Sequence, residues 1–331
     1  MTPTEFHALV VSEQPDGSFT RAITARAIGD LPDGDILVRV AYSSLNYKDA
    51  LSATGNKGVT RRFPHTPGID AAGTVAEGAA GDLGPGDPVI VTGHDLGMGT
   101  AGGFGQYIRV PAAWVQPLPA GMTLRESMIL GTAGLTAAMA VRRVTQDVAP
   151  DAGDILVTGA TGGVGSLAVA LLAGLGYRVV AVSGKADAAR VLQPLGAAEI
   201  IGRDEAAGPA DRPLLKTRWA GAVDTVGGDL LAAVVKATAP LGTVACCGNV
   251  GGIGLPLNVF PFILRGVSLV GIDSQNCPAD LRRDLWARLA GDWRLPQLED
   301  LSREIPLEEL EPAIHDILHG RITGRTLVSL P

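Results

Sequence analysis

A glycine-rich turn at residues 158–165, with the sequence Thr-Gly-Ala-Thr-Gly-Gly-Val-Gly, constrains the fold of this chain more than any other feature. Apolar runs precede it at residues 155–157 and follow it at 167–172, and a third occupies 179–182. This order predicts a strand, a turn, a helix and a second strand, which form one βαβ unit. Glycine lets such a turn approach a pyrophosphate, which then lies at the positive end of the helix. The residues expected to line the phosphates are Thr161, Gly162, Gly163 and Val164.

The end of the second predicted strand indicates which nicotinamide cofactor binds. A site for NADH places Asp or Glu there, where the carboxylate binds the ribose hydroxyls, whereas this chain has Ser183, Gly184 and Lys185. A hydroxyl and an ammonium can bind a 2′-phosphate, and no carboxylate is there to repel it. Arg203, after the next apolar run, can supply a second cation. We therefore predict NADPH, with a solvated lysine in a turn as the alternative interpretation of Lys185.

The pattern of apolar runs changes near residue 124. Before it, short strand-like runs are separated by proline and glycine, which is typical of a small barrel. After it, six strand-like runs alternate with helical segments, which is typical of a doubly wound parallel sheet. The last strand-like run, 325–329, needs a sheet to join, so we expect it to return to the N-terminal part. We predict an α/β protein with a Rossmann NADPH-binding domain at 126–270 and a discontinuous, β-rich barrel-like domain at 1–125 and 271–331.

Charge and cysteine content limit the partners. The net charge of −7 argues against nucleic-acid binding and gives no basic face for a membrane. Three cysteines do not make a disulfide framework, and the N-terminus lacks the features of a signal peptide. We predict a cytoplasmic protein that acts on a small molecule. We also expect a homodimer, because the predicted strand at 268–272 is an apolar sheet edge that needs a cover.

Short segments along the whole chain occur in the order found in one superfamily. They are residues 43–49, 67–75, 84–89 and 131–137 before the glycine-rich turn, and 183–185, 224–227, 260–265 and 324–328 after it. In joint order and spacing they resemble the medium-chain dehydrogenase/reductase superfamily. The finer resemblance is to its zinc-free, quinone-oxidoreductase-like branch and, within that, to the acryloyl-CoA reductase group. It implies that the β-rich domain is GroES-like.

The residues that zinc-dependent relatives use as ligands are missing. Those relatives have Cys near the position of Asn46 and a His-Glu pair near Ile69 and Asp70, together with a four-cysteine lobe. This chain has no cysteine before Cys246. The soft ligands of a tetrahedral zinc site are therefore absent, and we expect no metal.

The resemblance implies reduction of an activated C=C bond, with hydride added to the β-carbon and the enolate protonated at the α-carbon. Negative charge then builds on a carbonyl or thioester oxygen, which needs hydrogen-bond donors. By resemblance, Tyr47 is the candidate acid, and Arg325 contacts the enolate oxygen or the cofactor phosphates. Asp49 and Asp70 orient these two residues. The alternatives are ordinary packing for Tyr47, a surface charge for Arg325 and structural ion pairing for the two aspartates.

Three further residues are expected near the nicotinamide. Asn46 is a candidate for positioning the cofactor, while Asn249 and Ile272 follow later strands of the predicted sheet. Ligands in doubly wound sheets lie at the carboxyl ends of the strands.

The substrate implied by the resemblance is acryloyl-CoA, which would be reduced to propanoyl-CoA. Candidate residues for its anionic CoA part are the pairs Arg61 with Arg62 and Arg282 with Arg283. Two alternatives remain open: an NADPH:quinone oxidoreductase or general enone reductase, and a non-catalytic protein that senses NADPH.

Overall fold

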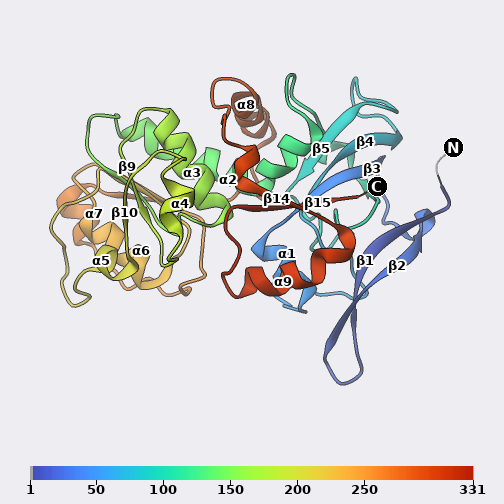
Figure 1. Ribbon diagram of the computed structural model, residues 1–331, viewed down its shortest axis with the longest axis horizontal. Helices are drawn as coiled ribbons and strands as arrows, with labels where there is room; N and C mark the ends of the chain where they lie inside the picture. The colour runs from blue at the N-terminus through green and yellow to red at the C-terminus, as the bar shows by residue number, and fades with distance from the viewer. Residues whose placement is uncertain (1–2, 331) are drawn as a thin grey trace. The chain divides into compact units, whose positions relative to one another are not determined.

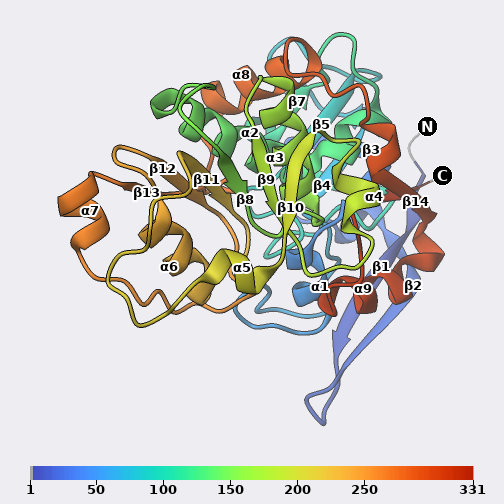
Figure 2. The ribbon, with the colours of Figure 1, turned by 60° about the vertical axis from the view of Figure 1, so that its left-hand side comes forward.

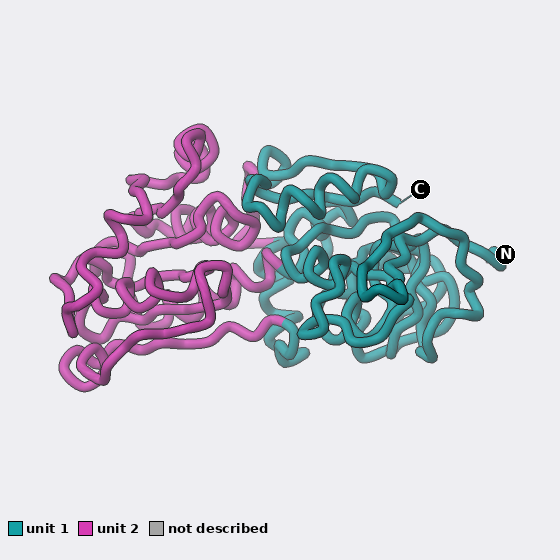
Figure 3. The backbone as a smooth tube through the Cα atoms, turned by 90° about the horizontal axis from the view of Figure 1, so that it is seen from below, with its two compact units in different colours: residues 1–132, 275–290, 298–331 teal, residues 133–274, 291–297 magenta. Residues whose placement is uncertain are grey.

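The computed structural model describes residues 3–330, which form two compact units (Figure 3). Unit 1 runs to Thr132 and also contains Gln275–Ala290 and the chain from Leu298 onward. Unit 2 contains Ala133–Ser274 and Gly291–Gln297. Unit 1 is thus assembled from three separate parts of the sequence. The exact domain bounds given above stay a prediction.

Unit 2 is built on a parallel sheet of six strands in the order β10-β9-β8-β11-β12-β13. The strands are β8 (Ile155–Val157), β9 (Val179–Val182), β10 (Ala197–Ile201), β11 (Gly221–Asp224), β12 (Thr243–Cys246) and β13 (Ser268–Gly271). The first three strands extend the sheet one way and the last three extend it the other way. This reversal between β8 and β11 is the point where ligands bind in doubly wound sheets. The predicted Rossmann sheet is therefore confirmed.

Helices cover both faces of this sheet (Figure 2). They are α3 (Gly163–Gly174), α4 (Ala188–Leu192), α5 (Arg203–Ala207), α6 (Gly228–Ala237) and the second half of α2 (Leu124–Asp147), while α7 (Phe260–Arg265) comes directly before the edge strand β13. Helix α3 is almost entirely apolar, and its residues from Gly165 to Leu172 are buried, as expected for a helix without a polar face. Among residues 3–330, no helix is both long enough and apolar enough to cross a membrane.

Unit 1 is built on a mixed sheet of seven strands (Figure 1). Its main order is β14-β15-β3-β4-β5-β7, and β6 pairs with β3. The strands are β3 (Ile36–Leu45), β4 (Asp70–Glu77), β5 (Pro88–Thr92), β6 (Tyr107–Val110), β7 (Gln116–Pro117), β14 (Ser302–Pro306) and β15 (Arg325–Ser329). The C-terminal strand β15 pairs antiparallel with β3, so Thr326 lies opposite Leu45. This pairing places Arg325, at the start of β15, beside the end of β3 at the candidate site.

The rest of unit 1 packs around this sheet. It comprises the hairpin of β1 (Glu5–Glu13) and β2 (Phe19–Ala27), and the helices α1 (Tyr47–Ala53), α8 (Ala279–Ala290) and α9 (Leu310–Leu318). Strand β14 was not predicted from the sequence. It pairs only with β15, at the edge of the sheet, and Ile305 is its one buried side chain. An edge strand with a single apolar contact carries little periodic signal.

Candidate active site

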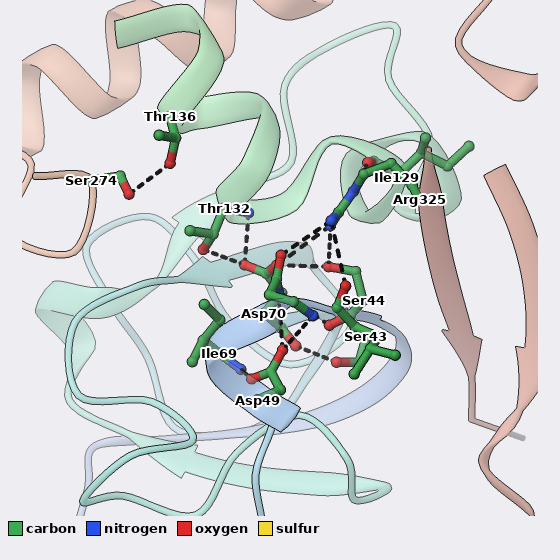
Figure 4. Close-up of polar contacts among 12 residues, drawn as sticks. Ser43, Ser44, Asp49, Ile69, Asp70, Ile129, Thr132, Thr136, Ser274 and Arg325 are labelled. Atoms are coloured by element: carbon green, nitrogen blue, oxygen red, sulfur yellow. Dashed lines mark hydrogen bonds and ion pairs between the residues drawn. The ribbon is translucent and has the colours of Figure 1, made fainter. Parts of the chain in front are cut away.

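A buried cluster of polar side chains lies where β3 ends and β4 begins (Figure 4). At its centre, the carboxylate of Asp70, the first residue of β4, has no solvent exposure. Its Oδ2 atom accepts hydrogen bonds from the Ser44 hydroxyl at 2.6 Å and from Asn46 Nδ2 at 2.8 Å. Its Oδ1 atom accepts from the Thr132 backbone N–H at 2.9 Å and from the Thr132 hydroxyl at 2.6 Å. Four donors therefore hold this carboxylate in place. We call Ser44, Asn46, Asp49, Asp70, Thr132 and Arg325 the polar cluster.

Arg325, the first residue of β15, supplies the positive charge of the polar cluster. Its side chain is 3% exposed, and its Nη2 atom lies 3.9 Å from Asp70 Oδ2. It donates from Nε to the Ile129 carbonyl at 2.8 Å, from Nη2 to the Ser44 hydroxyl at 2.9 Å and from Nη1 to Asn46 Oδ1 at 3.1 Å. Burial lowers the pKa of the guanidinium, and the nearby aspartates oppose that shift. The alternative interpretation of Arg325 as a surface charge is wrong, because the guanidinium is enclosed by protein acceptors.

Asn46 and Asp49 form the start of helix α1. The Asp49 Oδ2 atom accepts from the Asn46 backbone N–H at 2.8 Å and from Asn46 Nδ2 at 3.1 Å, and Oδ1 accepts from the Ile69 N–H at 2.8 Å. This is a capping box, which satisfies donors at the helix start. Burial, followed by the charge of Asp70, raises the pKa of the Asp49 carboxyl to about 7.

These contacts correct one expectation from the sequence and add to another. Asp49 was expected to orient Tyr47 through a hydrogen bond, but its carboxylate instead binds Asn46 and the backbone of Ile69. The expectation that Asn46 positions the cofactor stays a prediction. Its side-chain amide joins the charges of the polar cluster: Nδ2 donates to both aspartates, and Oδ1 accepts from Arg325.

Tyr47 is the exposed residue next to the polar cluster. It is the first residue of α1 and is 37% exposed. Within residues 3–330 its phenol makes no hydrogen bond. The polar cluster fixes the backbone on either side of Tyr47, because Asn46 caps the helix and Asp49 closes the capping box. The phenol is therefore held on a rigid helix start and is available to a ligand.

A break in α2 at Gly131 makes room for the polar cluster. Gly131 has φ 50° and ψ −153°, a backbone conformation that is essentially restricted to glycine. A Cβ atom there would lie 2.5 Å from Asp70 Oδ2 and 2.7 Å from the Ser44 hydroxyl. The break leaves the Ile129 carbonyl to Arg325 and the Thr132 N–H to Asp70. From the sequence, residues 131–137 were expected only as part of a family motif, and the roles of Ser44, Gly131 and Thr132 were missed.

By the resemblance described above, Asn46 and Asp70 lie near positions at which zinc-dependent relatives have metal ligands. Asn46 and Asp70 are bonded to each other at 2.8 Å. Within the part of the chain that the structure describes, no group of three or more His, Cys, Asp or Glu residues is placed to hold a metal ion.

The glycine-rich turn lies in unit 2, between β8 and α3. Gly162 is the N-cap of the 12-residue helix α3, so the turn leads directly to the positive end of the helix. A Cβ atom at Gly165 would overlap the Gly159 carbonyl oxygen, so the last glycine of the turn allows the helix and the turn to pack closely. Thr161 is buried, and its hydroxyl lies 3.2 Å from the Ser183 hydroxyl at the end of β9. Thr161, Gly162, Gly163 and Val164 therefore occupy the positions expected for a phosphate-binding turn.

The residues predicted to select the cofactor come together after β9. The Ser183 hydroxyl accepts from the Lys185 N–H at 3.1 Å. A Cβ atom at Gly184 would lie 3.5 Å from Arg203 Nε, so this guanidinium, at the start of α5, lies against Gly184. Burial lowers the pKa of Lys185, and the charge of Asp187 opposes that shift. The Ser183 hydroxyl and the Arg203 guanidinium thus lie near Lys185 at the end of β9, and a hydroxyl and cations are groups that bind phosphate.

The ends of the other strands complete the cofactor side of the sheet. Exposed Asn249 lies shortly after β12, and Ile272 follows β13 directly. A link that sequence reasoning missed joins β8 to β11: buried Asp224 accepts from the Thr158 hydroxyl at 2.7 Å and from the Gly227 N–H at 2.8 Å. Burial raises the pKa of Asp224. This bond ties together the two strands between which the sheet order reverses.

Comparisons with known proteins agree with this architecture. A family model described as "Alcohol dehydrogenase GroES-like domain" matches residues 32–120, and one described as "Zinc-binding dehydrogenase" matches residues 163–291. The acrylyl-CoA reductase AcuI of Ruegeria pomeroyi is 44% identical over 98% of this chain and 99% of its own. YhfP of Bacillus subtilis, which carries a quinone oxidoreductase name, is 44% identical over 99% of both chains. The chain belongs to the medium-chain dehydrogenase/reductase superfamily.

Solved structures give the same result. The yhdH oxidoreductase of Salmonella enterica, in complex with NADP, matches with a TM-score of 0.95 at 43% identity, covering 98% of this chain and 100% of its own. The Bacillus subtilis yhfP structure, with NAD bound, matches with a TM-score of 0.95 at 43% identity, covering 99% and 100%. The two relatives thus carry different nicotinamide cofactors.

Proposed function

We propose that this protein is an NADPH-dependent oxidoreductase that reduces the activated C=C bond of acryloyl-CoA to give propanoyl-CoA. The observation that carries the proposal is the polar cluster beside Tyr47. Hydrogen bonds link Asn46 to Asp70 and to Arg325, and an exposed phenol adjoins them. By the resemblance, Asn46 and Asp70 replace residues of a zinc site, and an acid beside them suits conjugate reduction better than alcohol oxidation.

The residues of unit 2 fit NADPH. The open helix start at Gly162 suits the pyrophosphate, and Ser183, Lys185 and Arg203 suit the 2′-phosphate. When bound, NADPH supplies the hydride that adds to the β-carbon of the substrate. This protein's own contribution is to hold the cofactor and to stabilise the charge that develops on the thioester oxygen.

Tyr47 is the proposed proton donor to the α-carbon or, before that, the hydrogen-bond donor to the thioester oxygen. Arg325, Asp70, Asn46 and Asp49 are positioning residues in this proposal, because their polar atoms bind one another. They hold the start of α1 and therefore the phenol. The sequence-based idea that Arg325 contacts the enolate oxygen or the cofactor phosphates is replaced here by this role.

Kinetics with labelled reagents test the assignment of Tyr47. With acryloyl-CoA and saturating NADPH, Tyr47→Phe should lower kcat more than it raises KM, since loss of one transition-state donor costs about 10²–10³ in rate. Half-buried Tyr42 is the matched control, and Tyr42→Phe should keep near-normal kcat. Deuterium from labelled NADPH should appear at the β-carbon and deuterium from D₂O at the α-carbon. Cofactor label at the α-carbon, or an unaffected Tyr47→Phe, would reject the mechanism.

A second candidate function is reduction of quinones or simple enones, which the name of the Bacillus subtilis relative favours. A non-catalytic NADPH sensor is the further alternative. A panel of acryloyl-CoA, crotonyl-CoA and quinones, each with NADPH and NADH, separates the three functions by kcat/KM. Higher kcat/KM for a quinone than for acryloyl-CoA would favour quinone reduction. NADPH binding without turnover of any of these substrates would favour the NADPH sensor.

We also propose that the protein forms a homodimer through the β13 edge of unit 2. Helix α7, next to this edge strand, exposes Phe260, Ile263 and Leu264, and Val259 before it is exposed too. An uncovered strand edge beside an apolar patch is a site for association. Sedimentation at micromolar concentration should give a dimer, and Ile263→Asp with Leu264→Asp should give a monomer. A monomeric wild-type protein contradicts this proposal.

The three free cysteines fit the proposed cytoplasmic location, which cell fractionation tests.

A further inference from the structure

The two arginine pairs singled out in the sequence have different environments. Arg282 is only 2% exposed and donates to the carbonyls of Thr92 and Gln275, and Arg283 forms an ion pair with Asp280 at 2.6 Å. The expectation that this pair binds an anionic substrate is wrong for Arg282, because its guanidinium lies inside unit 1 and is used there.

Arg61 and Arg62 are, in contrast, both exposed. Within residues 3–330, neither side chain has an ion pair or a hydrogen bond. Two adjacent cations without a counter-ion are notable on a chain of net charge −7. A pair of guanidinium groups in this state is suited to phosphate, which it can bind through two parallel hydrogen bonds.

The segment that carries the pair is held on both sides. Before it, the hydroxyl of buried Thr60 lies 2.7 Å from the hydroxyl of Ser52 in α1. After it, the Lys57 ammonium lies 4.8 Å from the ring centroid of Phe63 and 2.6 Å from the carboxylate of Glu13. Glu13 therefore neutralises Lys57 and leaves the charge of the arginines uncompensated. The backbone that carries the two arginines is therefore fixed by these contacts. Binding of a ligand to the pair would restrict little more than the two arginine side chains.

This segment lies within reach of Tyr47. Ser52 is in the same helix as Tyr47, and at 1.5 Å per residue their Cα atoms are about 7.5 Å apart along the axis. Because Thr60 touches Ser52 and Arg61 is the next residue, the Arg61 Cα atom lies within roughly 20 Å of the Tyr47 Cα atom. A CoA thioester has its reactive acyl group at one end and its phosphates at the other. The spacing suits such a ligand, whereas a quinone has no phosphate for these arginines to bind.

We propose that Arg61 and Arg62 bind the phosphate groups of the CoA moiety and so select acyl-CoA substrates over uncharged ones. This inference rests on the proposed function, since it assigns the far end of the same substrate. The pair contributes through electrostatic attraction at an exposed site, so its effect weakens as ionic strength rises. It changes the capture of acyl-CoA and leaves the chemical step unaltered.

Kinetics with two thioesters test the inference. The substrates are acryloyl-CoA and acryloyl-N-acetylcysteamine, which has the same reacting group and no phosphate. In Arg61→Ala/Arg62→Ala, kcat/KM for acryloyl-CoA should fall about five- to thirtyfold at low salt, as expected for two exposed charge contacts. For the phosphate-free thioester it should stay within about twofold of wild type. The matched control is Arg39→Ala/Arg303→Ala, which removes two other exposed arginines of unit 1 and should leave both substrates unchanged.

Binding of free CoA separates this inference from the proposed function. Calorimetry with saturating NADP⁺ present, which fills the dinucleotide site, should show CoA binding to wild type and a loss of about fivefold or more in Arg61→Ala/Arg62→Ala. That loss supports the phosphate site even if neither thioester is reduced, in which case the proposed reaction fails alone. Unchanged CoA affinity, or an equal fall of kcat/KM for both thioesters, overturns the inference. Arg61→Lys/Arg62→Lys should bind CoA better than the alanine variant, because it keeps the charge, and the opposite order also overturns it.

Discussion

Gly131→Ala is the change that most directly tests how the polar cluster is built. The native conformation at φ 50° and ψ −153° is strained for any residue with a Cβ atom, which costs about 1–3 kcal/mol. The new methyl group would also lie 2.5 Å from Asp70 Oδ2 and 2.7 Å from the Ser44 hydroxyl. Forcing extra volume into a packed site costs about another 1–3 kcal/mol. The variant should therefore lose roughly 2–6 kcal/mol of unfolding free energy.

Scanning calorimetry measures this loss. For domains of this size, 1 kcal/mol shifts the unfolding temperature by about 2–4 °C, so unit 1 should unfold roughly 5–20 °C earlier in the variant. The matched control is Gly84→Ala, also in unit 1, where φ is ordinary and no atom lies within 4 Å of the new methyl group. It should unfold within about 1 kcal/mol of wild type. Equal unfolding temperatures for Gly131→Ala and wild type would refute the argument that glycine is needed for the cluster.

Three further predictions concern charge and packing. Lys185→Ala should weaken NADPH binding about tenfold or more and leave NADH binding nearly unaffected, because one charge-assisted contact contributes about 1.5–3 kcal/mol. Fluorescence titration measures both affinities, and equal losses for the two cofactors contradict the assignment of Lys185. Burial raises the Asp49 pKa from 3.8 to about 7, so the folded state binds more protons in this range and the contribution of Asp49 to stability falls as pH rises from about 4 to 7. In urea unfolding, the unfolding free energy of Asp49→Asn should depend less on pH than that of wild type. Parallel curves of unfolding free energy against pH for the two proteins contradict this prediction. Gly165→Ala should abolish tight cofactor binding, because the new methyl group overlaps the Gly159 carbonyl. Unchanged NADPH affinity in the same fluorescence titration contradicts this prediction.

The sequence alone determined the features that depend on local pattern. The strands and helices of unit 2 follow from apolar runs separated by glycine-rich turns, because each βαβ unit is specified by residues close together in the chain. The NADPH prediction followed from Ser183 and Lys185 at the end of one strand. The missing zinc ligands were also readable from the sequence, since a metal site requires particular residue types whatever the packing.

Only the tertiary structure decided which polar groups meet. Asn46 and Arg325 are 279 residues apart, and they bond because β15 pairs with β3. No local pattern specifies that pairing. The sequence also did not reveal which side chains are exposed. Arg62 and Arg282 each belong to a pair of adjacent arginines, but Arg282 is buried and donates to the carbonyls of Thr92 and Gln275, while Arg62 is exposed. The physical reason is that a buried charge must find partners, and the partners come from whichever strands and helices pack around it.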